Sequence, residues 1–158
     1  MPSVNFVSKD HTLGINAFHL QWCPKYRFKV LGGNHLRQVL KESVSSTAQE
    51  YGIQIFAMEI SLDHVHLFVN LPSTLCVASA LQLFKGRSSR EIFKACPTFR
   101  GTYHKGHFWS RGSFFRSVSN VSADTIHKYI TEHRSKELAN SVADVRKEFG
   151  QMNLLSFY

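Results

Sequence analysis

The sequence contains 158 residues, which is the size of a single domain and long enough to bury about two thirds of the surface that the unfolded chain exposes. Hydrophobic residues make up 43% of the chain and aromatic residues 13%, so the composition predicts a packed core and argues against disorder. Nineteen Lys and Arg against eleven Asp and Glu give a formal net charge of +8. That surplus favours a polyanionic partner, nucleic acid first and acidic membranes second.

Three classes of protein are disfavoured by the same sequence. The richest apolar run, residues 75–84, is too short for the roughly 20 residues that a membrane-spanning helix needs. The N-terminus lacks the basic and apolar regions of a secretory signal. The three cysteines are odd in number and far apart, so they predict reduced thiols in a cytoplasmic protein rather than disulfides or a zinc finger.

The first predicted elements are a strand and a helix. Apolar side chains alternate loosely in residues 15–23, and the pattern predicts a strand that ends at Pro24. Residues 36–51 carry apolar side chains at three-to-four spacing and are followed by Gly52, which is typical of a helix and its end.

The middle of the chain predicts a β-hairpin and a second helix. Residues 53–61 and 64–71 are typical of strands, and the two-residue link 62–63 between them favours an antiparallel hairpin. Residues 75–95 predict a helix, which Gly86 leaves open to a kink or a division into two helices.

The last third of the chain predicts a hairpin, a helix and a tail. Residues 106–118 are expected to form a hairpin that turns at Arg111-Gly112, and Ser122 is expected to cap a final helix through about Ala139. Residues 140–158 predict a short helix and an extended end. This order of elements indicates an α+β fold in one domain over residues 1–158, an antiparallel sheet sandwiched by helices.

The positive charge is concentrated in residues 85–116, which hold eight Lys and Arg and one acid, Glu91. Aromatic residues are interleaved with this charge, and charge combined with flat rings is typical of a surface that binds single-stranded nucleic acid. The rings taken singly are better explained as core residues, whereas the charge as a whole favours nucleic acid. The candidate DNA-binding residues, in this window and in the basic segment after the first strand, are Lys25, Arg27, Lys85, Arg87, Arg90 and Arg111.

The sharpest local motif is His64-Val65-His66. Residues two apart on a strand point to the same face, so the two imidazoles are expected side by side with Val65 turned away. That is the geometry of a bidentate metal ligand. Alternatively, the pair consists of two polar side chains on a solvated sheet face.

A second motif lies on the predicted last helix. Tyr129 and His133 are four residues apart and share a helix face, beside a thin apolar stripe of Ile126 and Ile130. His133 could supply a third nitrogen ligand and leave coordination positions open, with Tyr129 about one helical turn away. Taken alone, the two residues are better explained as a surface tyrosine and a solvated cation of an amphipathic helix.

Together these motifs resemble a known family. The segment Leu62-Asp63-His64-Val65-His66-Leu67 is similar to the metal-binding core of the HUH endonucleases, in which U is a bulky apolar residue. Four more segments resemble, in order, the single-tyrosine HUH transposases of the smallest insertion sequences, the transposase A group, whose cousins are the repetitive-palindrome-associated tyrosine transposases. These segments are Trp22-Cys23-Pro24-Lys25-Tyr26-Arg27, Lys85-Gly86-Arg87-Ser88-Ser89-Arg90, His107-Phe108-Trp109-Ser110, and Val121-Ser122 leading to Lys128-Tyr129-Ile130. The resemblance runs from about residue 16 to residue 135.

The resemblance implies an activity and assigns roles to residues. Such proteins cut and rejoin single-stranded DNA at the ends of a mobile element through a 5′-phosphotyrosine. By position, Tyr129 is implied as the nucleophile, and His64 and His66 as ligands of a divalent metal, Mg²⁺ or Mn²⁺. The family usually has Gln four residues after the tyrosine as third ligand, and this sequence has His133 there, which favours softer ions such as Mn²⁺.

The resemblance also implies a fold and partners. The fold is the ferredoxin/RRM-like HUH endonuclease fold, and the DNA is expected to carry hairpin-forming element ends. A homodimer with composite active sites is implied, in which the tyrosine helix of one subunit completes the histidine pair of the other.

Two rival functions remain at this stage. An RRM-like sheet that binds single-stranded nucleic acid without chemistry would explain the charge and the rings, but it gives no reason for the histidine and tyrosine motifs. A relaxase or replication initiator of the HUH class is typically larger than this chain.

Overall fold

The computed structural model describes residues 7–9, 12–118 and 128 of the chain. The chain divides into two units, Met1–Val121 and Ser122–Tyr158, and the fold described below is that of the first unit. The helix predicted over 122–139 and the tail over 140–158 lie outside the described residues, apart from Lys128, so a single domain over the whole chain stays a prediction.

The first unit is built on a four-stranded antiparallel sheet. Its strands are β3 (Ala17–Trp22), β4 (Gln54–Ile60), β5 (Val65–Asn70) and β6 (Phe114–Val118), in the spatial order β4-β5-β3-β6. Two long helices connect them, α1 (Asn34–Glu50) after β3 and α2 (Val77–Ala95) after β5. The chain order βαββαβ with this strand order is the ferredoxin-like arrangement, so the predicted α+β class is confirmed.

Short elements complete the described chain. A separate two-stranded ribbon pairs β1 (Val7–Lys9) with β2 (Thr12–Gly14). The remaining turns of helix are η1 (Lys25–Arg27), α3 (Phe99–Thr102) and η2 (His104–Gly106). No helix within the described residues is long and apolar enough to cross a membrane.

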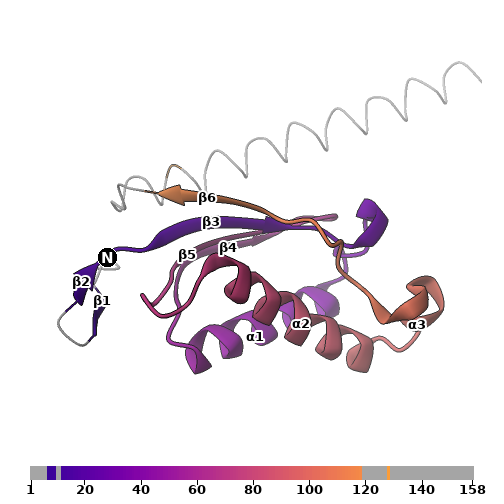
Figure 1. Ribbon diagram of the computed structural model, residues 1–158. Helices are drawn as coiled ribbons and strands as arrows, with labels where there is room; N and C mark the ends of the chain where they lie inside the picture. Colours follow the sequence, from indigo (N-terminus) through magenta and orange to yellow (C-terminus); the bar gives the residue numbers. More distant parts are fainter. Residues whose placement is uncertain (1–6, 10–11, 119–127, 129–158) are drawn as a thin grey trace, which may run out of the picture. The chain divides into compact units, whose positions relative to one another are not determined.

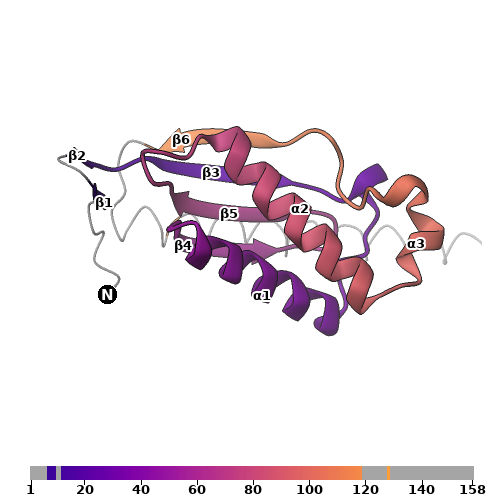
Figure 2. The same ribbon diagram turned by 60° about the horizontal axis from the view of Figure 1, so that its bottom comes forward.

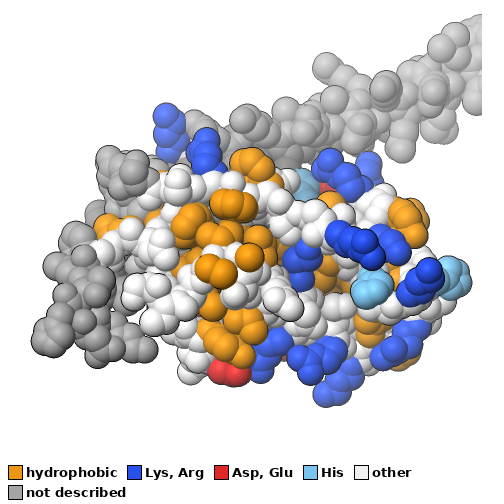
Figure 3. Space-filling view, viewed as in Figure 1, with side chains coloured by type: hydrophobic (Ala, Val, Ile, Leu, Met, Phe, Trp, Pro, Cys, Tyr) orange, Lys and Arg blue, Asp and Glu red, His pale blue; other side chains and the backbone are white. Residues whose placement is uncertain are grey.

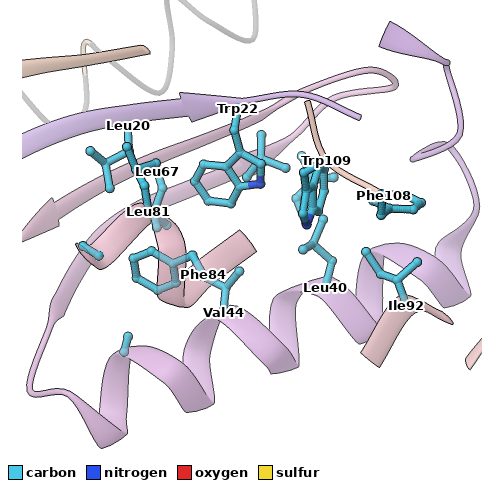
Figure 4. Packing of buried hydrophobic residues seen from close by; sticks show 14 of the residues in the cluster. Leu20, Trp22, Leu40, Val44, Leu67, Leu81, Phe84, Ile92, Phe108 and Trp109 are labelled. Atoms are coloured by element: carbon cyan, nitrogen blue, oxygen red, sulfur yellow. The ribbon is translucent and has the colours of Figure 1, made fainter. Parts of the chain in front are cut away.

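The hydrophobic core lies between the sheet and the two long helices, which cover the same face of the sheet (Figures 1 and 2). Leu20 and Trp22 of β3 point toward Val44 of α1 and Phe84 of α2, and all four side chains are buried (Figure 4). In α1 the buried apolar residues recur every fourth position, as expected for a helix with one face against a core. The buried positions are Leu36, Leu40, Val44 and Ala48.

Helix α2 runs without interruption through Gly86, so the predicted alternative of a kink or two helices is not realised. Phe84 and Ser88 flank the glycine and are both fully buried, and the Ser88 hydroxyl donates a hydrogen bond to the Phe84 carbonyl oxygen, 2.6 Å away. Contacts on this face therefore hold the helix straight at the exposed Gly86.

The predicted hairpin over residues 106–118 is wrong. The backbone N–H of Ser110 donates to the carbonyl of Cys23 at 2.9 Å, and β6 pairs with β3, so the whole segment runs beside one stretch of chain instead of folding back on itself. The reason is the buried Trp109, whose indole N–H donates to Ser88 Oγ at 2.9 Å and thereby fixes the segment against α2.

Most aromatic rings of the basic window belong to the core, as the sequence favoured. The buried rings of the window are Phe93, Tyr103, Phe108 and Trp109, and Phe84 directly before it is buried as well. Two rings are exposed instead, Phe114 at 53% and Phe115 at 56% of their surface. Because they are successive residues of a strand, they point to opposite faces of the sheet.

Candidate active site

The imidazoles of His64 and His66 lie side by side at the start of β5. The predicted β4–β5 hairpin is confirmed by antiparallel pairing from Gln54↔Asn70 to Ile60↔Val65. His64 lies in the turn directly before β5 and His66 within the strand, and their ring centroids are 4.6 Å apart with the rings nearly perpendicular. The tight connection thus places the two imidazoles next to each other, one partly exposed and one buried.

Asp63 holds His64 from the turn. Its Oδ1 lies 2.6 Å from His64 Nδ1, and its Oδ2 lies 3.3 Å from the guanidinium of Arg27. Burial raises the pKa of this carboxyl, but the hydrogen bond and charge of His64, with the charge of Arg27, outweigh burial, so the pKa of Asp63 lies below its usual value. The ionised carboxylate holds Nδ1 of the His64 ring, which would leave Nε2 of that ring for a metal ion. Asp63 is therefore placed to orient His64 and not to bind a metal itself.

His19 contacts the second imidazole and was missed by the sequence analysis. Its Nε2 lies 2.9 Å from His66 Nδ1, and both rings are buried. The ring planes differ by 18° and the centroids are 5.1 Å apart, which is the separation of imidazoles joined nitrogen to nitrogen rather than laid face on face. The alternation within β3 gives the face on which His19 lies. The sequence has no local signal for the pairing of β3 with β5, so it could not show that His19 contacts His66.

The contact with His19 occupies Nδ1 of His66, so a metal ion would have to bind His66 through Nε2. For His66 to coordinate through Nε2, its Nδ1 must carry the proton and donate to His19 Nε2. We expect His19→Leu, which removes that acceptor, to weaken binding of Mn²⁺ by about 10- to 100-fold, measured by electron paramagnetic resonance of the free ion. His19→Gln, whose amide oxygen can accept the same hydrogen bond, should recover part of the affinity. Unchanged Mn²⁺ affinity in His19→Leu would show that the contact has no such effect.

Two imidazoles with occupied Nδ1 atoms are a suitable part of a site for a divalent transition metal. Within the described part of the chain, no three His, Cys, Asp or Glu side chains gather closely enough to hold a metal ion. The predicted third ligand His133 and the predicted nucleophile Tyr129 both lie outside the described residues, so their roles stay predictions.

The six candidate DNA-binding residues differ in their surroundings. Arg90 and Arg111 are exposed, and Lys25 places its amine 5.0 Å from the centre of the Tyr26 ring. Arg27 contacts Asp63, as described above. On the face shown in Figure 3, most Lys and Arg side chains gather toward the end of the sheet where η1 and α3 lie.

Two of the six candidates, Lys85 and Arg87, are engaged by other parts of the protein. Lys85 Nζ donates to the carbonyl oxygens of Arg111 and Gly112, at 3.2 and 3.4 Å, and burial lowers the pKa of its ammonium. Arg87 pairs with Glu50 of α1. These contacts give both residues a structural task besides any contact with DNA.

Comparisons with known proteins identify relatives of this chain and agree with its fold. The model of a family described as IS200-like transposases matches residues 15–133. The ISDra2 transposase TnpA of Deinococcus radiodurans is 32% identical over 120 residues, which are 76% of this chain and 85% of that protein. The transposase of insertion sequence element IS200 from Salmonella typhimurium is 26% identical over 130 residues, which are 82% of this chain and 84% of that protein.

Solved structures show the same arrangement. A crystal structure of a candidate transposase from Deinococcus radiodurans R1 has a TM-score of 0.65 and 25% identity, and the match covers 80% of this chain and 96% of that one. A REP-associated tyrosine transposase bound to a REP hairpin has a TM-score of 0.54 and 14% identity over 87% of this chain and 73% of that one, and it shows the fold alone.

The fold, the histidine pair and these matches together define an enzyme of DNA transposition. The family match extends over three quarters of the chain and includes the positions of His64, His66, Tyr129 and His133. This chain belongs to the family of IS200-like transposases.

Proposed function

We propose that this transposase cuts and rejoins single-stranded DNA at insertion-sequence ends through a 5′-phosphotyrosine on Tyr129. The observation that carries the proposal is the pair of adjacent imidazoles, His64 and His66, each with its Nδ1 held by a neighbour from the fold. Such an arrangement is typical of metal ligands and has no evident purpose in a protein that only binds nucleic acid.

In this proposal His64, His66 and His133 hold one divalent ion, Mg²⁺ or Mn²⁺. Bound there, the ion would stabilise the negative charge that develops on the scissile phosphate. Asp63 and His19 hold the two Nδ1 atoms, so the Nε2 atoms would be the ones that coordinate the ion.

Tyr129 supplies the nucleophile. A tyrosine hydroxyl has an ordinary pKa of about 10 and is a weak nucleophile at neutral pH unless its surroundings activate it. Its oxygen forms a bond to phosphorus while the bond from phosphorus to the 3′-oxygen breaks. The tyrosine loses its proton and the departing 3′-hydroxyl gains one. A 3′-hydroxyl of another strand can reverse this step without ATP, and the sequence accordingly shows no GxxxxGK[ST] motif.

The experiment that tests the proposal is the capture of the covalent intermediate. Single strands carrying an element end and a label on the 3′ side of the cut are incubated with the protein and Mn²⁺, then boiled in SDS. We expect a labelled band that migrates with the protein. Bound but uncut strands, with no band that survives SDS, would instead support the RRM-like binding protein.

The basic surface should make DNA binding strongly dependent on salt. Each phosphate neutralised on a single strand contributes a slope of about −0.7 to the plot of log affinity against log salt. We expect Arg111→Ala, which removes an exposed cation of the basic window, to lower the slope by about that amount in fluorescence titrations. Lys41→Ala on α1 is the matched control and should leave the slope unchanged. A flat salt response of the unaltered protein would argue against phosphate contacts.

The DNA partner and the assembly are part of the proposal. Hairpin-forming element ends are proposed as substrate because a related fold was solved with a REP hairpin. The protein is proposed to act as a homodimer in which Tyr129 of one subunit serves the histidine pair of the other. Co-expressed His66→Ala and Tyr129→Phe chains should then regain part of the cleavage activity that each homodimer lacks. Sedimentation that finds only monomer at micromolar concentration, without such recovery, would refute the composite site.

A further inference from the structure

We propose that a hollow beside the imidazole pair seats one base of the DNA strand, next to the phosphate that is cut. This hollow, which we call the base seat, has a volume of about 310 Å³ and lies between the end of β3 and residues 110–114. Its lining includes Gln21, Arg27, Ser110, Ser113 and Phe114. The inference rests on the proposed function, since it takes the histidine pair as the place of cleavage.

The base seat arises from an irregularity in strand pairing. β6 pairs with β3 as far as Phe114↔Gln21, and pairing resumes where Ser110 N–H donates to the Cys23 carbonyl. Between these points Arg111, Gly112 and Ser113 face the single residue Trp22. The surplus residues must therefore bulge out of the ladder and leave a space at its edge.

Lys85 holds this bulge in place from α2. Besides its bonds to the two carbonyl oxygens of the bulge, its ammonium donates to Ser113 Oγ at 3.0 Å. Three hydrogen bonds from one partly buried ammonium fix the position of residues 111–113, so the base seat is preformed in the fold rather than left to a loose loop.

Two residues that line the base seat, Gln21 and Arg27, connect it to the imidazole pair. Gln21 lies directly opposite His66 in the pairing of β3 with β5 and directly opposite Phe114 in the pairing with β6, so these three side chains form one row on the same sheet face. From the other side, Arg27 reaches Asp63, which holds His64. A strand with its phosphate at the histidine pair would thus place an adjoining base over Phe114.

The chemistry of the lining fits a nucleobase better than an apolar ligand. The Phe114 ring is half exposed and offers a flat face on which any base can stack. The Gln21 amide and the hydroxyls of Ser110 and Ser113 can donate to and accept from the edge of a base. Arg27 adds positive charge for the phosphate beside it.

Phe115 provides a matched control within the same strand. It is exposed to the same degree as Phe114, but it points to the opposite face of the sheet, where it pairs with Leu20 of the core. If any exposed aromatic ring strengthens binding, Phe114→Leu and Phe115→Leu should lower the affinity for DNA equally. If the base seat is responsible, only Phe114→Leu should lower it.

The test compares affinity for two single strands of equal length and charge, one of oligo-dT and one in which every nucleotide is abasic. We expect Phe114→Leu to weaken binding of oligo-dT by about 5- to 150-fold, the equivalent of one base–aromatic stack, and to leave the abasic strand unaffected. Phe115→Leu should bind both strands like the unaltered protein. Gln21→Leu, which leaves the ring in place, should weaken oligo-dT and not the abasic strand.

The opposite results would overturn the base seat. Equal losses in Phe114→Leu and Phe115→Leu, or equal losses on both strands, would show that no base stacks on Phe114. A thermal melt of each variant shows whether it is folded, and Gln21→Leu repeats the test without touching the ring. Since binding of oligo-dT needs no cleavage, a covalent adduct without discrimination would refute the base seat alone. If Phe114→Leu weakens only the binding of oligo-dT but no covalent adduct forms, the base seat is supported and the proposed chemistry is refuted.

Discussion

Tyr129→Phe should abolish strand cleavage while leaving the affinity for single-stranded DNA essentially unchanged. The substitution removes one oxygen and keeps the ring, so the packing of the side chain is preserved while the proposed nucleophile is lost. We expect the cleavage rate to fall by at least about 10³-fold, because water cannot readily replace a positioned nucleophile. Labelled strands separated on a denaturing gel give the rate, and a fluorescence titration of the same strands gives the affinity.

A matched substitution separates this effect from the loss of any tyrosine hydroxyl. Tyr26 is exposed and lies in η1, within the basic segment after β3. Tyr26→Phe should therefore cut at a rate close to that of the unaltered protein. Undiminished cleavage by Tyr129→Phe would rule out the assigned nucleophile, whatever the behaviour of Tyr26→Phe.

His66→Ala should cause the second largest loss. It removes one of the two adjacent imidazoles and leaves His19 without the partner it contacts at 2.9 Å. We expect the metal-dependent cleavage rate to fall by more than about 10²-fold at fixed Mn²⁺, with partial recovery as the Mn²⁺ concentration is raised. His64→Ala should behave in the same way, whereas the affinity of both variants for single strands should change little.

Two controls bear on this second prediction. His35→Ala removes an exposed imidazole from the start of α1, and it should leave the rate and its metal dependence unchanged. Chelation of divalent ions with EDTA should stop cleavage by the unaltered protein. Full activity in EDTA would contradict the assignment of His64 and His66 as metal ligands.

The sequence alone was sufficient for much of the fold because its local patterns agree with the tertiary structure. Leu36, Leu40 and Val44 recur at helical spacing and are buried in α1. The short link at Asp63 correctly predicted the β4–β5 hairpin. The prediction of a hairpin after α2 was wrong because Arg111-Gly112, which resembles a turn, forms a bulge beside β3. The segment is fixed beside β3 by the hydrogen bond from Trp109 to Ser88. These two residues are 21 positions apart, so no local sequence pattern indicates their contact.

The candidate site was likewise predictable in part, where its residues are close in the sequence. The two-residue spacing of His64 and His66 predicted their proximity, although His64 lies in the turn before β5 and not in the strand itself. Arg27 and His19 could not be placed beside the pair, because their contacts depend on how β3 and the segment after it meet the β4–β5 hairpin. Lys85, predicted to contact DNA, also supports the bulge from α2. Charge alone does not distinguish these two tasks.

The most direct test of the account is to identify the residue that becomes attached to DNA. The SDS-stable adduct would be digested with trypsin and nuclease, and the nucleotide-bearing peptide sequenced by mass spectrometry. The account predicts a nucleotide linked through its 5′-phosphate to Tyr129. A nucleotide on any other residue, or cut strands with no protein attached, would contradict it.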